Sequence, residues 1–314
     1  MTSCIGKLTI LAGLATVAGC AALEQVQPAL PGKHSLVREQ LVIHSDFPLA
    51  AQHRLMEELT ARRFDLGRRL GLPLSDEPIH VYLFDDSDRF DRFMRLHYPG
   101  FPRRRAFFVE TDTRLMVYAH WGDRVAEDLR HEVTHAYLHS MVPRVSLWLD
   151  EGLAEYFEVP RGRGGLNRVH LDRLRARLER GDWRPDLRRI EQLSLPFDMT
   201  QDDYAESWAW VHFLLNSSSD QGGLLHEHLL RVRQNGSAEP LSVRLGPMLA
   251  QFEQMLIDHV GRQVSGARSF NPNTVHILRK PMLAPSPATA KPGKTAPLPV
   301  AGDQANKKHE RYWN

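Results

Sequence analysis

The sequence is poor in cysteine, in long apolar runs and in net charge. Its 314 residues include two cysteines, Cys4 and Cys20, which are too few for a disulfide framework or a four-cysteine zinc module. The 40 basic and 38 acidic residues leave a formal charge of +2. The chain therefore lacks the strong positive field typical of nucleic-acid binding, and we expect no nucleic-acid partner. Its 42% hydrophobic and 25% charged residues are typical of a globular protein and exclude a multi-span membrane protein.

The apolar run near the N-terminus, residues 8–17, is too short to span a bilayer, which needs about 20 residues. It follows Lys7 and ends in Val17-Ala18-Gly19-Cys20, a pattern typical of a secretory signal. Small residues directly before a cysteine resemble a bacterial lipobox, in which the cysteine is lipidated and becomes the first residue. We therefore expect residues 1–19 to be a signal peptide and Cys20 to carry the acyl chains that anchor the protein to a membrane.

The lipobox resemblance implies a location in the bacterial cell envelope. The residue after the cysteine is Ala21 rather than Asp, which favours the outer membrane, with the protein facing the periplasm. A plain cleaved signal, or an uncleaved one, is the alternative interpretation. Growth with labelled palmitate would test the anchor, and an unlabelled protein would exclude it.

Composition divides the rest of the chain into a body and a tail. Residues 281–300 contain six prolines separated mostly by Ala, Lys, Thr and Ser. Such a segment cannot bury enough apolar surface to fold, so we predict a disordered tail over residues 269–314. A linker is expected over 20–34, and one domain over 35–268.

The two halves of the body differ in their hydrophobic periodicity. The first half predicts strands at 36–44 and 79–84, helices at 48–70 and 87–96, and a hairpin of 105–110 with 114–120. After Gly122 the pattern is helical, over 123–140, 146–157, 166–180, 201–215, 224–234 and 245–261. A small mixed sheet with helices, followed by a helical half, predicts an α+β fold.

The strongest chemical signal is His131-Glu132-Val133-Thr134-His135, at the junction of the two halves. On a helix, positions i and i+4 lie on one face, with Cβ atoms about 5–6 Å apart. Two imidazoles at this spacing can bind one Zn²⁺, and the adjacent Glu132 can reach a water on the ion. Asp123 is expected to cap the helix. Two exposed or otherwise satisfied histidines on a surface helix are the alternative.

A catalytic zinc site needs a third protein ligand and an open fourth position. Cysteine is not available, and the three-histidine motif H-E-x-x-H-x-x-G-x-x-H fails, because Leu138 and Met141 stand at its last two defined positions. His139 is a candidate fourth ligand for a closed structural site.

The next predicted helix supplies two carboxylates, Glu151 and Glu155, four residues apart on one face. Burying such a pair is costly unless it meets a cation or hydrogen-bond donors. A zinc site would provide both, with Glu151 on the metal and Glu155 on the far nitrogen of a ligand histidine. Gly152 is expected to let this helix approach the first one closely. Two solvated surface acids are the alternative.

H-E-V-T-H followed by W-L-D-E-G-L-A-E-Y resembles the gluzincin zinc peptidases, the clan that contains thermolysin and aminopeptidase N. It resembles still more closely the peptidase-MA-like families of unknown function in bacterial lipoproteins. The resemblance covers residues 131–157 and implies a gluzincin-like fold. It also implies His131, His135 and Glu151 as Zn²⁺ ligands, Glu132 as general base and Glu155 as support for the first histidine. Two features differ: the spacing from His135 to Glu151 is a few residues shorter, and Asp150 replaces the usual Asn.

The resemblance also implies a group that stabilises the oxyanion and a strand that pairs with substrate. Tyr204 matches the tyrosine that has the first role in the aminopeptidase N branch; His212 and Tyr156 are weaker candidates, and a core tyrosine is the alternative. The strand at 114–120 is expected to be the edge that binds an extended peptide.

The resulting hypothesis is a membrane-anchored zinc-dependent peptidase that acts on a peptide or protein. Two alternatives stay open. One is a non-catalytic envelope module whose zinc site is structural, and the other is a zinc amidase that acts on peptidoglycan peptides.

Overall fold

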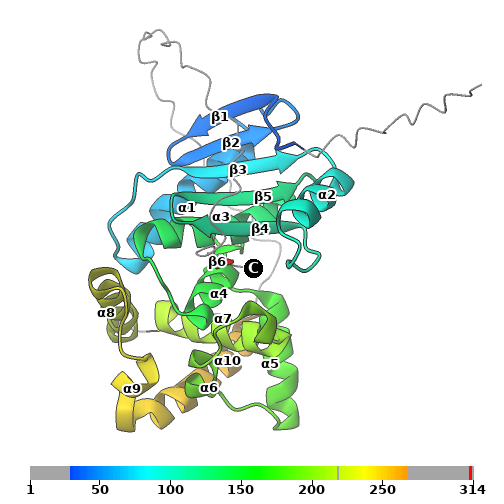
Figure 1. Cartoon of the computed structure of the whole chain (residues 1–314). Helices are drawn as coiled ribbons and strands as arrows, with labels where there is room; N and C mark the ends of the chain where they lie inside the picture. The colour runs from blue at the N-terminus through cyan, green and yellow to red at the C-terminus, as the bar shows by residue number, and fades with distance from the viewer. Residues whose placement is uncertain (1–28, 218, 268–310, 313–314) are drawn as a thin grey trace, which may run out of the picture.

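The computed structural model describes residues 29–217, 219–267 and 311–312. The predicted signal peptide with Cys20 lies outside the described residues, as does the predicted tail except for residues 311–312. The order of elements confirms the α+β class, because a mixed sheet with its helices precedes a helical half (Figure 1). Among the described helices, none combines the length and the apolar character needed to cross a membrane.

The sheet has the strand order β1-β2-β3-β5-β4-β6. Strands β2, β3 and β5 run parallel to one another, while β1 pairs with β2, β4 with β5 and β6 with β4 in the antiparallel sense. The strands are β1 (His34–Arg38), β2 (Leu41–Ser45), β3 (Ile79–Phe84), β4 (Ala106–Thr111), β5 (Arg114–His120) and β6 (Arg311–Tyr312).

Two strand predictions are wrong in detail. The segment predicted as one strand over 36–44 is a hairpin, because Glu39 adopts a left-handed backbone conformation with a φ of 49° and reverses the chain between β1 and β2. Strand β5 is not an edge strand. It pairs in parallel with β3 on one side and with its hairpin partner β4 on the other, so β4 lies farther out, and the two-residue β6 pairs with the outer side of β4. The consequence for the site is that β4, rather than β5, carries the outward-facing backbone groups.

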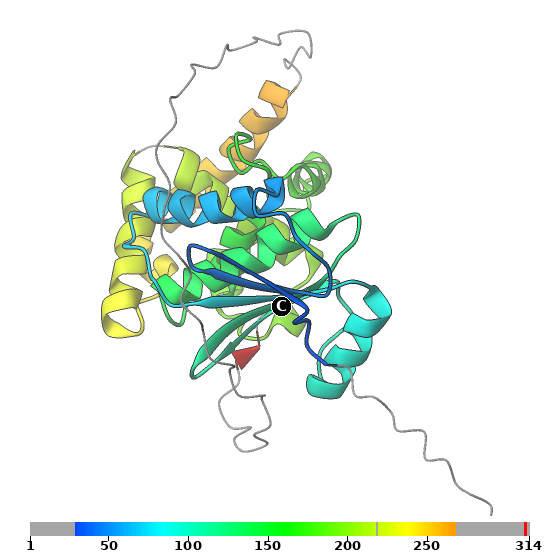
Figure 2. The ribbon, with the colours of Figure 1, turned by 90° about the horizontal axis from the view of Figure 1, so that it is seen from above.

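Helices cover both faces of the sheet (Figure 2). One face carries α1 (Arg54–Leu70) and α3 (Val125–Met141), and the other carries α2 (Ser87–His97). Leu129 and Val133 of α3 are fully buried against the sheet. The N-cap of α3 is Arg124, with no side-chain hydrogen bond, so the predicted cap at Asp123 is wrong. The helix ends at Met141, two residues before Pro143, which cannot continue a helix.

The helical half is organised around α7, which packs against α4, α5, α8 and α10. Its N-terminus carries a capping box in which Thr200 and Asp203 bond to each other's backbone N–H groups. Two tryptophans of α7, Trp208 and Trp210, are almost completely buried. The helices of this half are α4 (Leu147–Phe157), α5 (Arg168–Arg180), α6 (Leu187–Glu191), α7 (Gln201–Asn216), α8 (Ser219–Asn235), α9 (Leu241–Leu245) and α10 (Leu249–Ala267).

Gly152 brings α4 close to α7, and not to α3 as the sequence predicts. A Cβ atom at this position would lie 2.5 Å from the carbonyl oxygen of Ser207 and 2.9 Å from Cγ2 of Val211. The backbone of α7 cannot rotate away as a flexible side chain could. The contact therefore fixes the position of α4 and, with it, the neighbouring Glu151.

Replacing Gly152 with Ala is expected to destabilise the protein by about 1–3 kcal/mol, because the methyl group overpacks the α4–α7 contact. Chemical denaturation measures the effect. Gly223→Ala in α8 is the matched control, because no described atom lies within 4 Å of a Cβ there; it should be neutral or slightly stabilising. Equal stability of the two variants would show that the close approach does not hold α4 in place.

Candidate metal centre

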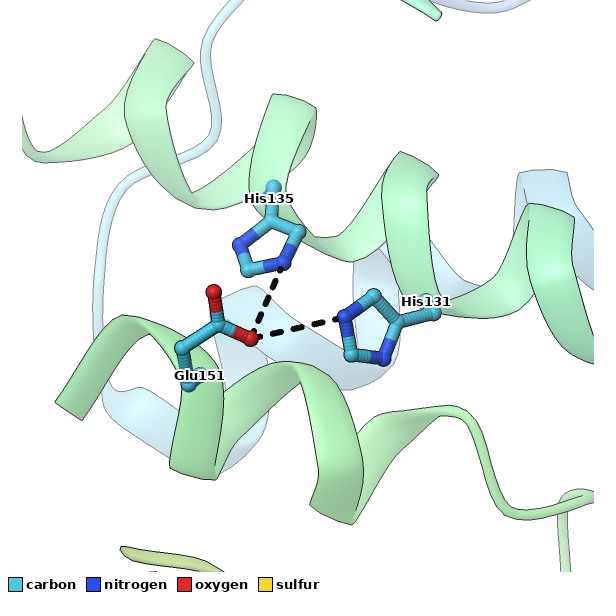
Figure 3. A group of neighbouring side chains, drawn as sticks. All are labelled: His131, His135 and Glu151. Atoms are coloured by element: carbon cyan, nitrogen blue, oxygen red, sulfur yellow. Dashed lines mark ion pairs between the residues drawn. The ribbon is translucent and has the colours of Figure 1, made fainter. Parts of the chain in front are cut away.

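Side chains from two adjacent helices converge where α3 faces α4 (Figure 3). His131 and His135 lie one turn apart on α3, and Glu151 faces them from α4. Oε2 of Glu151 lies 3.6 Å from Nε2 of His131 and 3.8 Å from Nε2 of His135. One possible ligand atom from each of the three residues lies within 4.8 Å of the other two. The three residues that the sequence proposes as ligands thus lie together.

The two distances from Glu151 to the imidazole nitrogens, 3.6 and 3.8 Å, are close to the spacing that a tetrahedral ion requires. Zn²⁺ with bonds of about 2.0–2.2 Å separates its ligand atoms by about 3.3–3.6 Å, close to the observed distances and longer than a good hydrogen bond. Nε2 of His135 is buried and, within the described part of the chain, has no hydrogen-bond partner. Glu151 is fully buried. A buried carboxylate facing two imidazole nitrogens fits a divalent cation well.

The far nitrogen of His135 faces Asp150 at ion-pair distance. Its Nδ1 lies 3.0 Å from Oδ2 of Asp150, and the same oxygen lies 3.2 Å from Nε2 of His139, whose Nδ1 lies 2.8 Å from Oε2 of Glu110. Burial alone would raise the pKa of Asp150, but the two rings bring this pKa well below its usual range. An ionised Asp150 orients the ring of His135 so that Nε2 faces Glu151.

The far nitrogen of His131 is held by Glu158, and not by Glu155 as the sequence predicts. Nδ1 of His131 lies 3.0 Å from Oε2 of Glu158, the residue after the last turn of α4. Glu155 instead lies 2.7 Å from Nε2 of His170 on α5. Asn167, at the start of α5, donates to both carboxylates, at 3.1 Å to Glu155 and 2.8 Å to Glu158. Within the described part of the chain, Glu155 forms no ion pair with either candidate ligand ring, although one of its carboxylate oxygens lies within 4.8 Å of a ring nitrogen of His131.

Glu132 links the centre to the sheet edge. Its Oε2 accepts a hydrogen bond from the backbone N–H of Phe108 in β4, at 2.7 Å. Burial and the charge of Glu151 raise the pKa of Glu132 to about 7, against the opposing charges of His131, His135 and Arg104. Glu132 and His131 line a cavity of about 660 Å³. Glu132 is therefore almost completely buried beside the candidate ligands, at the wall of this cavity.

Tyr204 lies at the same centre, next to Arg104. The guanidinium of Arg104 donates a hydrogen bond to the phenol oxygen of Tyr204. Burial, together with the charge of Glu151, raises the pKa of Tyr204 to about 12, although Arg104 opposes the shift. The phenol therefore keeps its proton at neutral pH and is a neutral hydrogen-bond donor.

The weaker candidates lie elsewhere. His212 pairs with His259 of α10, with 2.9 Å between Nδ1 and Nε2, and the hydroxyl of Tyr156 bonds to Asn216. Both nitrogens of His139 face carboxylates, so its prediction as a fourth ligand is wrong; His139 holds the residue that orients a ligand. Sequence reasoning missed Glu158 and Arg104.

The outer edge of β4 borders the centre. The backbone N–H of Phe108 points away from β5 and toward Glu132. Because backbone groups two residues apart point to the same side of a strand, the N–H of Glu110 also points away from β5. At this edge β6 pairs antiparallel with β4, with Glu110 opposite Arg311 and Val109 opposite Tyr312. The edge therefore accepts an extended segment immediately beside Glu132.

Together, the fold and the site define an α+β protein with a candidate three-ligand metal centre between a sheet edge and a helical half. Residues 125–228 match a protein family of unknown function, DUF1570. The match begins at the first residue of α3 and includes α4 and α7, so it contains the candidate ligands and Tyr204. No curated protein matches the chain.

Proposed function

We propose that this protein is a zinc-dependent peptidase that cleaves peptide bonds with a water activated at the centre of His131, His135 and Glu151. The observation that carries the proposal is the position of Glu132. It lies beside the candidate ligands, lines a cavity and accepts a hydrogen bond from β4, whose outer side pairs with the short strand β6. When bound, Zn²⁺ would acidify a water and polarise the carbonyl of the substrate.

The residues around the centre have complementary tasks in this reaction. Glu132 accepts a proton from water and releases it to the leaving amine, while the backbone N–H of Phe108 holds its carboxylate in position. Tyr204 donates a hydrogen bond to the substrate oxygen on which negative charge develops. Asp150 and Glu158 keep the two rings fixed, so that little reorganisation is needed during the reaction.

The cavity favours a catalytic centre over a purely structural one. A structural zinc site is closed by four protein ligands, whereas here His131 and Glu132 face a cavity of about 660 Å³. The lipid anchor at Cys20 and the envelope location complete the proposal, which then describes a membrane-anchored enzyme that acts on peptides or proteins in the periplasm.

A cleavage assay on a peptide library tests the proposed function. The zinc-loaded full-length chain should hydrolyse peptides, and a hydroxamate that binds zinc should inhibit it. Muropeptides are a second substrate set. Cleavage confined to them would favour the amidase alternative, while bound zinc without hydroxamate binding and without cleavage of either set would favour the structural module.

The position of β6 predicts that the chain's own C-terminus competes with substrate. Removing residues 309–314 should raise kcat/KM for peptides several-fold, because it frees the outer edge of β4. A synthetic peptide of residues 309–314 should then inhibit the shortened chain. A deletion of residues 285–294, which keeps β6, is the control and should leave kcat/KM unchanged. If removal of residues 309–314 has no effect, β6 does not compete with substrate.

A further inference from the structure

Three consecutive arginines, Arg103, Arg104 and Arg105, precede β4 and line the cavity beside the centre. Two of them are neutralised by carboxylates. Arg103 forms an ion pair with Asp91, and Arg105 forms a bidentate pair with Asp128, with Nε–Oδ2 and Nη2–Oδ1 distances of 2.8 and 2.6 Å. The flanking cations are therefore held by the protein itself.

Arg104 is placed differently. Among the described residues, no carboxylate forms an ion pair with it. Its hydrogen bond goes to the neutral phenol of Tyr204, and its charge acts on Glu132 and Glu151 from within the site. A guanidinium bound to one neutral oxygen keeps N–H donors for a planar, bidentate interaction with an anion.

The direction in which β4 runs indicates which part of a bound peptide would lie next to Arg104. Strand β6 shows that this edge pairs with a chain in the antiparallel sense. In a substrate bound in that sense, the N-terminal part lies beside Glu110 and the next part beside Phe108 and Glu132. The C-terminal part extends toward the start of β4. Arg104 stands two residues before that start. The residues that follow the cleaved bond are thus the ones that approach Arg104.

We propose that Arg104 binds a carboxylate on the C-terminal side of the cleaved bond, so that the enzyme prefers peptides with an acidic side chain or a free chain end at that place. This inference rests on the proposed peptidase function and adds a substrate class to it. Arg104 thereby determines specificity, and the same guanidinium positions Tyr204.

Binding of hydroxamates to the zinc-loaded full-length chain tests the proposal without requiring turnover. Four succinyl hydroxamates carry a short peptide arm. Two end in Glu or Gln with a blocked terminus, and two end in an apolar residue as free acid or amide. In the wild-type chain, at least one acid should bind about tenfold to hundredfold more tightly than its neutral partner. A difference within the Glu/Gln pair indicates that Arg104 binds an acidic side chain, and a difference within the acid/amide pair indicates that it binds a free chain end.

Arg104→Gln should abolish this difference, and Arg103→Gln, at the same cavity but paired with Asp91, should retain it. Equal binding of acid and neutral compounds by the wild-type chain would overturn the proposal, as would a difference that persists in Arg104→Gln. Either result leaves the peptidase function intact, because the hydroxamates still bind. If no hydroxamate binds to the zinc-loaded chain, the proposed function itself fails, and the role of Arg104 fails with it.

Discussion

Glu132→Gln is expected to lower kcat for peptide hydrolysis by about 10²–10⁴-fold, the usual contribution of a general base. The amide cannot accept a proton from water at neutral pH. Its oxygen can still accept the hydrogen bond that Phe108 donates at 2.7 Å, so the position of the side chain and of α3 should not change. Zinc should remain bound, because Glu132 is not one of the three candidate ligands. Steady-state kinetics and zinc analysis of the same sample measure both results.

Glu179→Gln is the matched control for this variant. Glu179 lies on the exposed side of α5, where it pairs with Arg175, so its replacement should leave kcat within about twofold of the wild-type value. Full hydrolysis by Glu132→Gln would show that another group accepts the proton, and would remove Glu132 from the proposed reaction.

His135→Ala is expected to weaken zinc binding by more than about a hundredfold and to abolish hydrolysis. The loss of an outer hydrogen-bond partner of a ligand typically costs 10–100-fold in metal affinity, and the loss of a ligand should cost more. The variant also leaves Asp150 buried with one histidine fewer. Zinc titration in competition with a chelator measures the affinity, and circular dichroism checks that the chain is folded.

Glu151→Gln is a second ligand variant that tests whether lost zinc binding is due to misfolding, because the amide keeps the size of the carboxylate. It should weaken zinc binding in the same direction without creating a cavity. His44→Ala is the control for histidine removal. His44 pairs with His80 on the sheet, away from α3, and its loss should leave zinc affinity unchanged. Wild-type affinity in both ligand variants would mean that zinc is held elsewhere.

The parts of the fold and site that depend on local spacing were predictable from the sequence. The α+β class follows from the change in hydrophobic periodicity after Gly122, and the structure confirms it. His131 and His135 share a helix face because they are four residues apart, which is a local property. Glu151 is assigned to the metal because a buried pair of carboxylates needs a cation, and the family resemblance supports the same ligand; nothing local to either helix determines how two helices pack.

The wrong predictions concern non-local partners. Glu151, Glu155 and Glu158 are spaced i, i+4 and i+7, so all three lie near one face of α4. Spacing cannot tell which of the latter two reaches His131. The choice depends on α5, whose Asn167 and His170 draw Glu155 away. The order of β4 and β5 likewise depends on which strand pairs with β3, and no residue within the hairpin specifies that.

X-ray absorption at the zinc edge of the purified full-length chain tests the central claim most directly. The proposed centre predicts one zinc ion per chain, with two imidazole nitrogens and oxygen ligands at about 2.0–2.2 Å. In the spectrum of His135→Ala, we expect the signal of one imidazole ligand to be lost. A zinc ion bound by sulfur, or a wild-type chain that retains no zinc, would contradict the assignment of His131, His135 and Glu151 as a metal centre.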